Sequence, residues 1–98
     1  MRADTTIRRN SQAVFRELAD GSGVLLHLES TAYHGLNPVG VVIWQLLEHG
    51  VTFERLIHGL RGQFESPPPD LEKDVDGFLS QLAQRDLIRF ETPASGAA

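Results

Sequence analysis

Polar and apolar residues alternate in two short segments in the first third of the chain. The segments AVFREL (residues 13–18) and GVLLHL (residues 23–28) place every second side chain on one face, which is typical of β-strands. The Asp20-Gly21 pair between them favours a hairpin turn. A third segment, TAYHGL (residues 31–36), follows a short turn, and the pattern therefore predicts a three-stranded antiparallel meander.

From residue 37 onward the apolar period changes to that of a helix. Asn37 can accept hydrogen bonds from the free amides of a first helical turn, and Pro38 suits the first helical position. The expected buried stripe consists of Val39, Val42, Ile43, Leu46 and Leu47. We expect Gly50 to be the C-terminal cap of this helix. Trp44 lies off the stripe, so it either packs under the sheet or contacts a partner enzyme.

A second amphipathic helix is predicted directly after Gly50. Thr52 is expected to cap its N-terminus, with Val51 packing onto Leu56 four positions into the helix. Its expected buried face consists of Phe53, Leu56, Ile57, Leu60 and Phe64. The ESPPPD segment (residues 65–70) ends this helix, because three consecutive prolines cannot continue it.

A third helix is expected from Leu71 to about Arg85, with Asp70 as its N-terminal cap. Its inner face would consist of Leu71, Val75, Phe78, Leu79 and Leu82. Residues 87–91 (LIRFE) predict a short final strand. Three strands followed by three helices predict an α+β, winged-helix-like domain, because so thin a meander needs helices on one face.

The chain of 98 residues suits one compact domain. We expect a flexible N-terminus at residues 1–12, a folded domain at 13–91 and a disordered tail at 92–98. No apolar run approaches the roughly 18 residues that span a bilayer, and no apolar stretch typical of a secretory signal follows the N-terminal arginines. These observations predict a cytoplasmic protein without a membrane partner.

The residues that carry chemistry are few and scattered. The chain has no cysteine, which excludes disulfides and thiolate catalysis. His27, His34, His49 and His58 show no spacing that places two of them on one face for a metal. The serines lack a nucleophile elbow, and the DGSG segment reads as a hairpin turn rather than a phosphate-binding loop. We therefore expect no catalytic residue, metal or cofactor.

Three segments carry a more specific signal through their order and spacing. They are VLLHLESTAYHGLNPVGVVIWQLL (residues 24–47), GVTFERLIHGLRGQF (50–64) and DLEKDVDGFLSQLAQRDLI (70–88). Together they resemble the PqqD-like family, which includes the chaperone of pyrroloquinoline quinone biosynthesis and the leader-binding partners of lasso-peptide proteases. The link LESTAYHGLNP (28–38) looks more like the broader branch with the lasso-peptide proteins than like the quinone-pathway branch.

The resemblance implies a non-catalytic function in peptide recognition. Members of the family hold the leader segment of a ribosomally made precursor peptide and present its core to a modifying enzyme or leader peptidase. The leader is implied to bind as an added strand between the third strand and the third helix. The implied partners are thus a precursor peptide and a peptide-modifying enzyme or leader peptidase.

Strand addition needs an open sheet edge with free backbone groups, and STAYHG (residues 30–35) suits this because it lacks lysine and proline. On the third helix, Phe78 would offer an apolar anchor site, and Asp74 could pair with a cationic or polar leader side chain. The expected peptide-binding residues are Thr31, Ala32, Tyr33, His34, Gly35, Leu36, Asp74, Phe78 and Gln81.

Two other functions are compatible with parts of the sequence. A winged-helix domain can bind DNA through its third helix, and Arg8 and Arg9 would favour this. The third helix, however, begins with four carboxylates against a single lysine, and the net charge is −4, so a nucleic-acid partner is disfavoured. The open edge could instead pair with a second copy, which would make a structural homodimer. The sequence leaves monomer and homodimer open.

Overall fold

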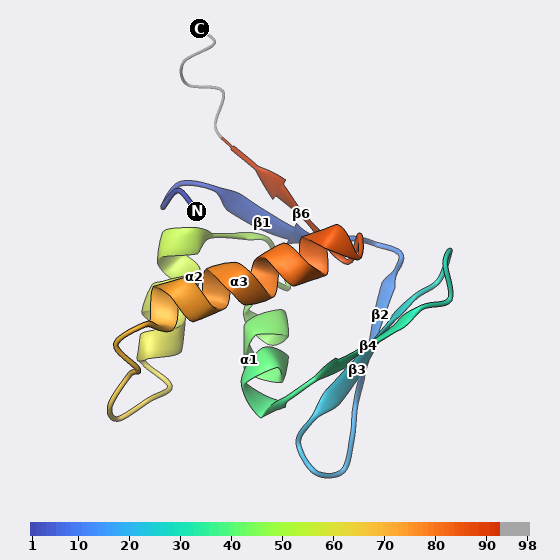
Figure 1. Cartoon of the computed structure of the whole chain (residues 1–98), viewed down its shortest axis with the longest axis horizontal. Helices are drawn as coiled ribbons and strands as arrows, with labels where there is room; N and C mark the ends of the chain where they lie inside the picture. Colours follow the sequence, from blue (N-terminus) through green and yellow to red (C-terminus); the bar gives the residue numbers. More distant parts are fainter. Residues whose placement is uncertain (93–98) are drawn as a thin grey trace, which may run out of the picture.

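The computed structural model describes residues 1–92 as an α+β domain (Figure 1), which confirms the predicted fold class. Its elements are β1 (Thr6–Arg9), β2 (Ala13–Glu17), β3 (Gly23–His27), β4 (Tyr33–Leu36), α1 (Pro38–Leu46), β5 (Val51–Thr52), α2 (Phe53–Arg61), α3 (Leu71–Gln84) and β6 (Ile88–Glu91). The strands form two sheets, β2-β3-β4 and β5-β1-β6. From residue 93 on, the predicted tail lies outside the described residues.

The β2-β3-β4 sheet is the predicted meander. β2 and β3 pair antiparallel with Phe15 opposite Leu25, and β3 pairs with β4 with Leu25 opposite His34. The third strand is shorter than expected, because it begins at Tyr33 rather than at residue 31. Thr31 has a φ of 58°, which is left-handed backbone and belongs to a turn rather than to a strand.

The second sheet includes a segment that the sequence analysis placed outside the fold. We expected residues 1–12 to be flexible, but β1 pairs with β6 and β5, and the side chain of Ile7 is fully buried. A strand with one buried apolar residue between polar ones shows no periodicity by itself. Its partner β6 confirms the short strand that was predicted at residues 87–91, although β6 pairs with β1 and not with the meander.

Arg9 anchors this strand to the first helix. Its guanidinium lies 4.6 Å from the centroid of the Trp44 ring, and both Nε and Nη2 donate to the Trp44 carbonyl. The bonds satisfy a carbonyl in the last turn of α1, where cations are favoured by the helix dipole. Trp44 itself is 2% exposed, so its side chain belongs to the core and does not form an exposed partner contact.

The helix starts agree with the sequence in two of three cases. Asn37 Oδ1 accepts from the Gly40 N–H at 2.7 Å, and Thr52 Oγ1 accepts from the Arg55 N–H at 3.2 Å. Asp70 was expected to cap α3, but its side chain makes no capping hydrogen bond. The predicted end of α1 was also too late, since the helix stops at Leu46 and Gly50 follows in a turn with a φ of 76°.

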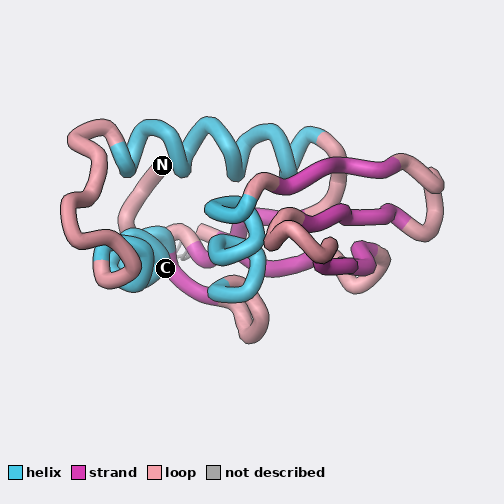
Figure 2. Tube along the Cα trace, turned by 90° about the horizontal axis from the view of Figure 1, so that it is seen from below, coloured by secondary structure: helices cyan, strands magenta, loops and turns pink. Residues whose placement is uncertain are grey.

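In Figure 2, α3 is the long helix along the top of the molecule, and the described strands lie below it. Its buried residues pack into a core that α1, α2 and both sheets share. The core consists of Ile7, Leu25, Leu36, Val41, Ile43, Trp44, Leu47, Phe53, Leu56, Ile57, Leu60, Leu71, Val75, Leu79, Leu82, Leu87 and Ile88. Val39 was expected there but is 41% exposed. The core leaves the outer edge of β4 free beside one flank of α3.

Candidate functional site

β4 is an edge strand of its sheet, and its backbone groups alternate in direction. The His27 N–H donates to the Ala32 carbonyl, which makes that pair a hydrogen-bonded one. Hydrogen-bonded and non-hydrogen-bonded pairs alternate along an antiparallel ladder, so the backbone groups of His34 point inward to β3. Those of Tyr33 and Gly35 consequently point outward. The open edge therefore offers the N–H and C=O groups of Tyr33 and Gly35 to another strand.

The side chains of β4 lie on two faces of the sheet. His34 and Leu36 share the face of Leu25, which is fully buried, whereas Tyr33 and Gly35 lie on the opposite face. Leu36 is 3% exposed, so its side chain belongs to the core. Tyr33 is 69% exposed and points away from the helix layer. Of the predicted strand residues, only His34 therefore has a half-buried side chain on the helix side of the edge.

Phe78 places one flank of α3 against the end of β4. A Cβ built on Gly40 would lie 3.3 Å from Phe78 Cζ and 3.4 Å from Leu36 Cβ, so ring, helix start and strand end meet at this point. Asp74 lies one turn before Phe78 and Gln81 lies one turn after it, and both are exposed. The three helix residues expected at the site thus share the flank that faces β4.

Arg85 extends the same flank toward the start of β4. It caps the C-terminus of α3, and its positive charge acts on His34. Burial of the ring and the nearby Arg85 charge, in that order, lower the pKa of His34 below its ordinary value. A neutral imidazole is therefore favoured at neutral pH. α3 and β4 run in opposite directions here, with Arg85 near His34 and Phe78 near Leu36.

Thr31 and Ala32 precede the edge strand rather than belonging to it. They lie in the turn between β3 and β4, and this turn is organised by His27. The His27 carbonyl accepts from the Thr31 N–H at 2.7 Å, and its ring Nδ1 accepts from the N–H groups of Glu29 and Ser30 at 3.2 and 3.3 Å. Two of the nine predicted residues therefore shape the approach to the edge without offering strand backbone.

Sequence reasoning missed four residues at this place, namely His27, Gly40, Arg85 and Asp86. His27 contacts Asp86 across 59 positions of sequence. Gly40 matters because it lacks a side chain where Phe78 packs. Cations are common near helix C-termini because they interact favourably with the helix dipole, so Arg85 did not indicate a binding site in the sequence. Only the tertiary arrangement brings these residues to the β4 edge.

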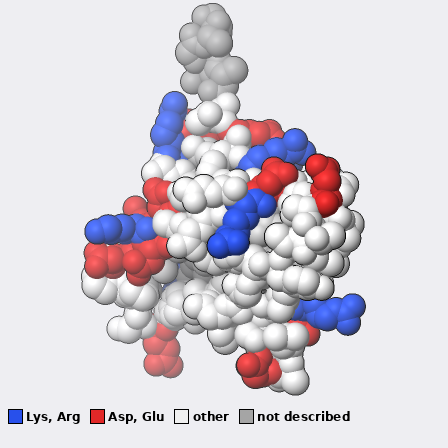
Figure 3. All heavy atoms as spheres, turned by 45° about the vertical axis from the view of Figure 1, so that its right-hand side comes forward, with Lys and Arg blue, Asp and Glu red and all other residues white. Residues whose placement is uncertain are grey.

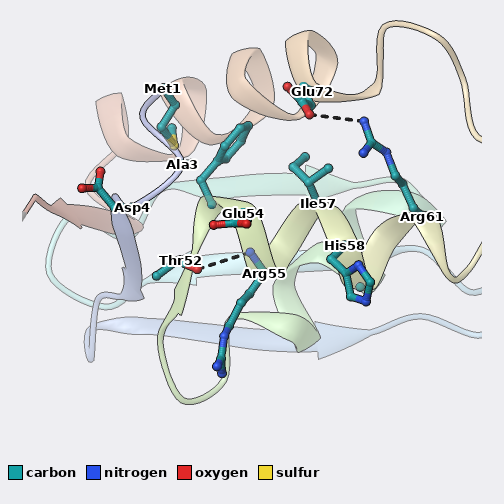
Figure 4. A pocket seen from close by; sticks show the side chains of 12 residues that line it. Met1, Ala3, Asp4, Thr52, Glu54, Arg55, Ile57, His58, Arg61 and Glu72 are labelled. Carbon is teal, nitrogen blue, oxygen red and sulfur yellow. Dashed lines mark hydrogen bonds and ion pairs between the residues drawn. The ribbon is translucent and has the colours of Figure 1, made fainter.

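A large hollow among the described residues lies elsewhere (Figure 4). It has a volume of about 1010 Å³ and lies between the N-terminal segment, α2 and the start of α3. Phe53 and Ile57 are its buried lining residues, and Figure 4 shows Arg61 paired with Glu72 at its border. A smaller hollow of about 190 Å³ lies beside Val39 and Phe64. None of the nine predicted residues lines either hollow, so the candidate site is an edge and not a cavity.

Three further features bear on what the described residues can bind: metal-ligating groups, apolar helices and surface charge. Residues 1–92 contain no group of three or more histidine, aspartate or glutamate side chains that could hold a metal ion. No helix among the same residues is long and apolar enough to cross a membrane. Figure 3 shows basic and acidic side chains scattered over one face between broad uncharged areas. That face therefore has no cluster of cations of the kind that binds a nucleic-acid backbone.

Residues 22–88 match the family described as coenzyme PQQ synthesis protein D (PqqD). The chain belongs to this family. The match spans more than half of the 98 residues and confirms the resemblance found in the three sequence segments. It includes β3, β4 and all three helices, and thus every element of the candidate site.

Two solved structures resemble this PqqD-family chain. "TbiB1 in Complex with the TbiA(beta) Leader Peptide" is 33% identical, with a TM-score of 0.74 over 84% of this chain and 94% of that chain. "Lasso peptide synthetase B1 complexed with the leader peptide" is 23% identical, with a TM-score of 0.70 over 85% of this chain and 96% of that chain. At that lower identity the second likeness concerns the fold alone. No curated protein matches the chain.

Proposed function

We propose that this protein binds the leader segment of a ribosomally synthesised precursor peptide as an extra strand at the β4 edge, without catalysing a reaction. The observation that carries the proposal is the open edge of β4 beside the Phe78 flank of α3. The likeness to TbiB1, whose structure contains a leader peptide, supports it. Strand addition at an exposed edge is an established mode of peptide recognition.

The backbone of the edge supplies affinity that is independent of sequence. Tyr33 and Gly35 offer an outward N–H and C=O each, which allows up to four ladder hydrogen bonds with an added strand. Each such bond contributes about 0.5–1.5 kcal/mol net. Gly35 has no heavy atom within 4 Å of an added Cβ, so another chain can approach it closely.

Side chains beside the edge supply the selectivity. Alternate residues of an added strand point to the α3 side, where they meet His34, Phe78 and Arg85. The half-buried Phe78 ring offers an apolar contact, and burying one leucine-sized leader side chain there is worth about 1.5–3 kcal/mol. The exposed Asp74 and Gln81 provide polar partners further along the helix. An extended leader with apolar residues at alternate positions fits this arrangement.

Binding the leader would raise the concentration of the attached core peptide at a partner enzyme. The partner is a peptide-modifying enzyme or leader peptidase, and the link at residues 28–38, which resembles the branch with the lasso-peptide proteins, favours a leader peptidase. Tethering of this sort increases the effective concentration of a substrate without new contacts to its reacting part. Such a protein acts in the compartment where precursor peptides are made, which favours the cytoplasm.

The test is a titration of the protein with the N-terminal half of the precursor peptide encoded beside its gene. We expect saturable binding by isothermal titration calorimetry. Tyr33→Pro and Gly35→Pro should each weaken binding about tenfold, because each removes an outward donor and distorts the edge. His34→Pro removes an inward donor to β3, so it should lower stability instead. Arg55→Ala, in the remote hollow, is the matched control and should bind like the wild type. A wild-type protein that binds no such peptide would refute the proposal.

The same open edge supports a second candidate, a homodimer in which two β4 strands pair. Light scattering with and without the leader separates the two. A dimer that persists at saturating peptide favours the structural role, whereas a monomer that binds one peptide favours leader recognition. DNA binding is disfavoured by the acidic first turn of α3, which contains Glu72 and Asp74.

A further inference from the structure

His27 is a buried histidine whose ring hydrogen bonds are all accounted for. The residue is 4% exposed, and its Nδ1 accepts from the backbone N–H groups of Glu29 and Ser30. A ring nitrogen that accepts two N–H groups carries no proton, so the proton of the neutral ring is on Nε2. Nε2 then donates to Asp86 Oδ2 at 3.0 Å. His27 therefore connects the β3–β4 turn to the residue that follows the C-cap of α3.

Asp86 occupies a backbone position that favours glycine. Its φ is 60°, its N–H donates to the Ala83 carbonyl, and the next N–H, of Leu87, donates to the Leu82 carbonyl. This is the hydrogen-bond pattern of a Schellman motif, in which the left-handed residue is usually glycine. Aspartate tolerates the conformation better than most residues but at a cost. Glycine would be the favourable choice here if backbone conformation were the only requirement.

The carboxylate of Asp86 explains the departure from glycine. It makes the hydrogen bond to His27, while the Asp86 carbonyl accepts from Asn10 Nδ2 at 2.7 Å. The Asp86 side chain is 78% exposed. A pair with so exposed a partner adds little to global stability. The hydrogen bond is thus better suited to fixing a position than to holding the fold together.

The two partners lie at the ends of the two elements that border the candidate site. Asp86 directly follows Arg85, the C-cap of α3, and the turn that His27 organises leads directly into Tyr33. α3 also comes close to the end of β4 where Phe78 packs against Gly40, which lies beside Leu36. The His27–Asp86 hydrogen bond is therefore one of the contacts that fix the position of α3 relative to β4.

We propose that His27 and Asp86 are positioning residues for leader binding. Their hydrogen bond sets the spacing between the start of β4 and the C-terminal end of α3, and with it the affinity for a strand added between them. The inference rests on the proposed function, because it concerns the same edge. Neither residue needs to touch the peptide.

The decisive comparison is Asp86→Gly against Asp86→Asn. Glycine relieves the left-handed backbone, and this gain offsets the loss of the acceptor for the buried His27 Nε2–H, so D86G should melt close to the wild type. Its affinity for the leader should nevertheless fall about fivefold, the equivalent of one net hydrogen bond. Asparagine keeps an acceptor for His27 Nε2 and tolerates the same backbone, so D86N should restore binding to within about twofold of the wild type. Equal binding by wild type and D86G would overturn the positioning role.

His27→Asn provides an independent variant from the other partner. Its amide oxygen can replace Nδ1 as the acceptor for the turn, but the side chain is too short to reach Asp86. H27N should therefore lose affinity as D86G does, and the double variant should lose no more than either single one. An additive loss would contradict the coupling. If D86G does not fold, H27N against wild type gives the same test.

A spectroscopic readout separates positioning from general damage. The Nε2–H proton of His27 should give a slowly exchanging NMR signal in the wild type and in D86N, and this signal should be absent in D86G. If the wild type binds no leader at all, the proposed function fails together with this inference. If the wild type binds and D86G binds equally well, only the positioning role fails.

Discussion

The ring of Phe78 on α3 packs against the bare backbone of Gly40 on α1, so close that a Cβ at residue 40 would lie 3.3 Å from Phe78 Cζ. The contact joins the last helix to the start of the first, at the point where β4 ends. Because the same ring flanks the open edge, a change at Gly40 acts on the candidate site without touching it.

Gly40→Ala should move the Phe78 ring by a few tenths of an ångström toward the edge and weaken leader binding. The gain in helix propensity of up to about 1 kcal/mol offsets the tight contact, so the free energy of unfolding should change by less than about 1 kcal/mol. Calorimetry and urea denaturation measure the two quantities. Gly59→Ala on α2 is the control, since its Cβ would lie 3.6 Å from Leu46 in ordinary contact. It should stabilise the protein and leave binding unchanged; equal binding by both variants would exclude Phe78 from the site.

The lowered pKa of His34 predicts that the stability of the protein depends on pH. Burial and the Arg85 charge lower its pKa from the ordinary 6.5, so the unfolded chain takes up this proton first as the pH falls. Above pH 6.5 the ring is neutral in both states and does not change the free energy of unfolding. As the pH falls from 6.5 toward the lowered pKa, the unfolded state binds more protons, so the free energy of unfolding should decrease. Urea denaturation at about pH 7.5 and about pH 5.5 measures the difference, which should shrink in His34→Gln. In Arg85→Gln, an NMR titration should show a higher pKa for His34 than in the wild type. An unchanged pKa would mean that the Arg85 charge does not act on His34.

Arg9 and its neighbour Arg8 should differ in their importance for stability. Arg9→Ala removes the hydrogen bonds to the Trp44 carbonyl and the stacking on its ring, and should lower the free energy of unfolding by about 1.5–3 kcal/mol. Arg8→Ala removes an exposed ion pair with Glu91, at 2.7 Å, and the side-chain contact beside Gly50, and should cost less than about 1 kcal/mol. Chemical denaturation of the two variants provides the comparison. Similar losses would contradict a specific role for Arg9.

Thr31 is a β-branched residue in left-handed backbone, which is an unfavourable combination. Thr31→Asn should raise the free energy of unfolding by roughly 1 kcal/mol, because asparagine tolerates this conformation better. The loss of the Thr31 hydroxyl hydrogen bond to the Ser30 carbonyl reduces the gain. Thermal denaturation monitored by circular dichroism measures the effect. A lower melting temperature in the variant would mean that the hydroxyl bond outweighs the backbone strain.

The sequence predicted those elements whose signals are local. The polar–apolar alternation in residues 13–18 and 23–28 predicted β2 and β3. The side chains of Asn37 and Thr52 cap helices as expected. β1 was not predicted, because Thr6–Arg9 is recognisable only through pairing with β6, about 80 positions away in sequence. The end of a helix also depends on contacts with distant residues, and α1 ends at Leu46, before the glycine that was expected to cap it.

The candidate site was predictable as a strand but not in its details. The sequence placed Tyr33 and His34 together on one edge, yet it contained no information on which of them turns its backbone outward. That direction follows from the hydrogen bond between His27 and Ala32, which sets the phase of the ladder. The flank of α3 depends in the same way on the contact between Phe78 and Gly40. The use of the nine predicted residues in binding stays a prediction.

The alternation along β4 also limits how a guest chain can shift. Outward groups recur at every second residue, Tyr33 and then Gly35, so a peptide that slips by one position exchanges its helix-facing side chains for solvent-facing ones. Only steps of two residues, about 6.6–6.8 Å, preserve the pattern. If the leader binds at this edge as proposed, its register changes only in steps of two residues, and the distance from the bound segment to a partner enzyme changes by the same step.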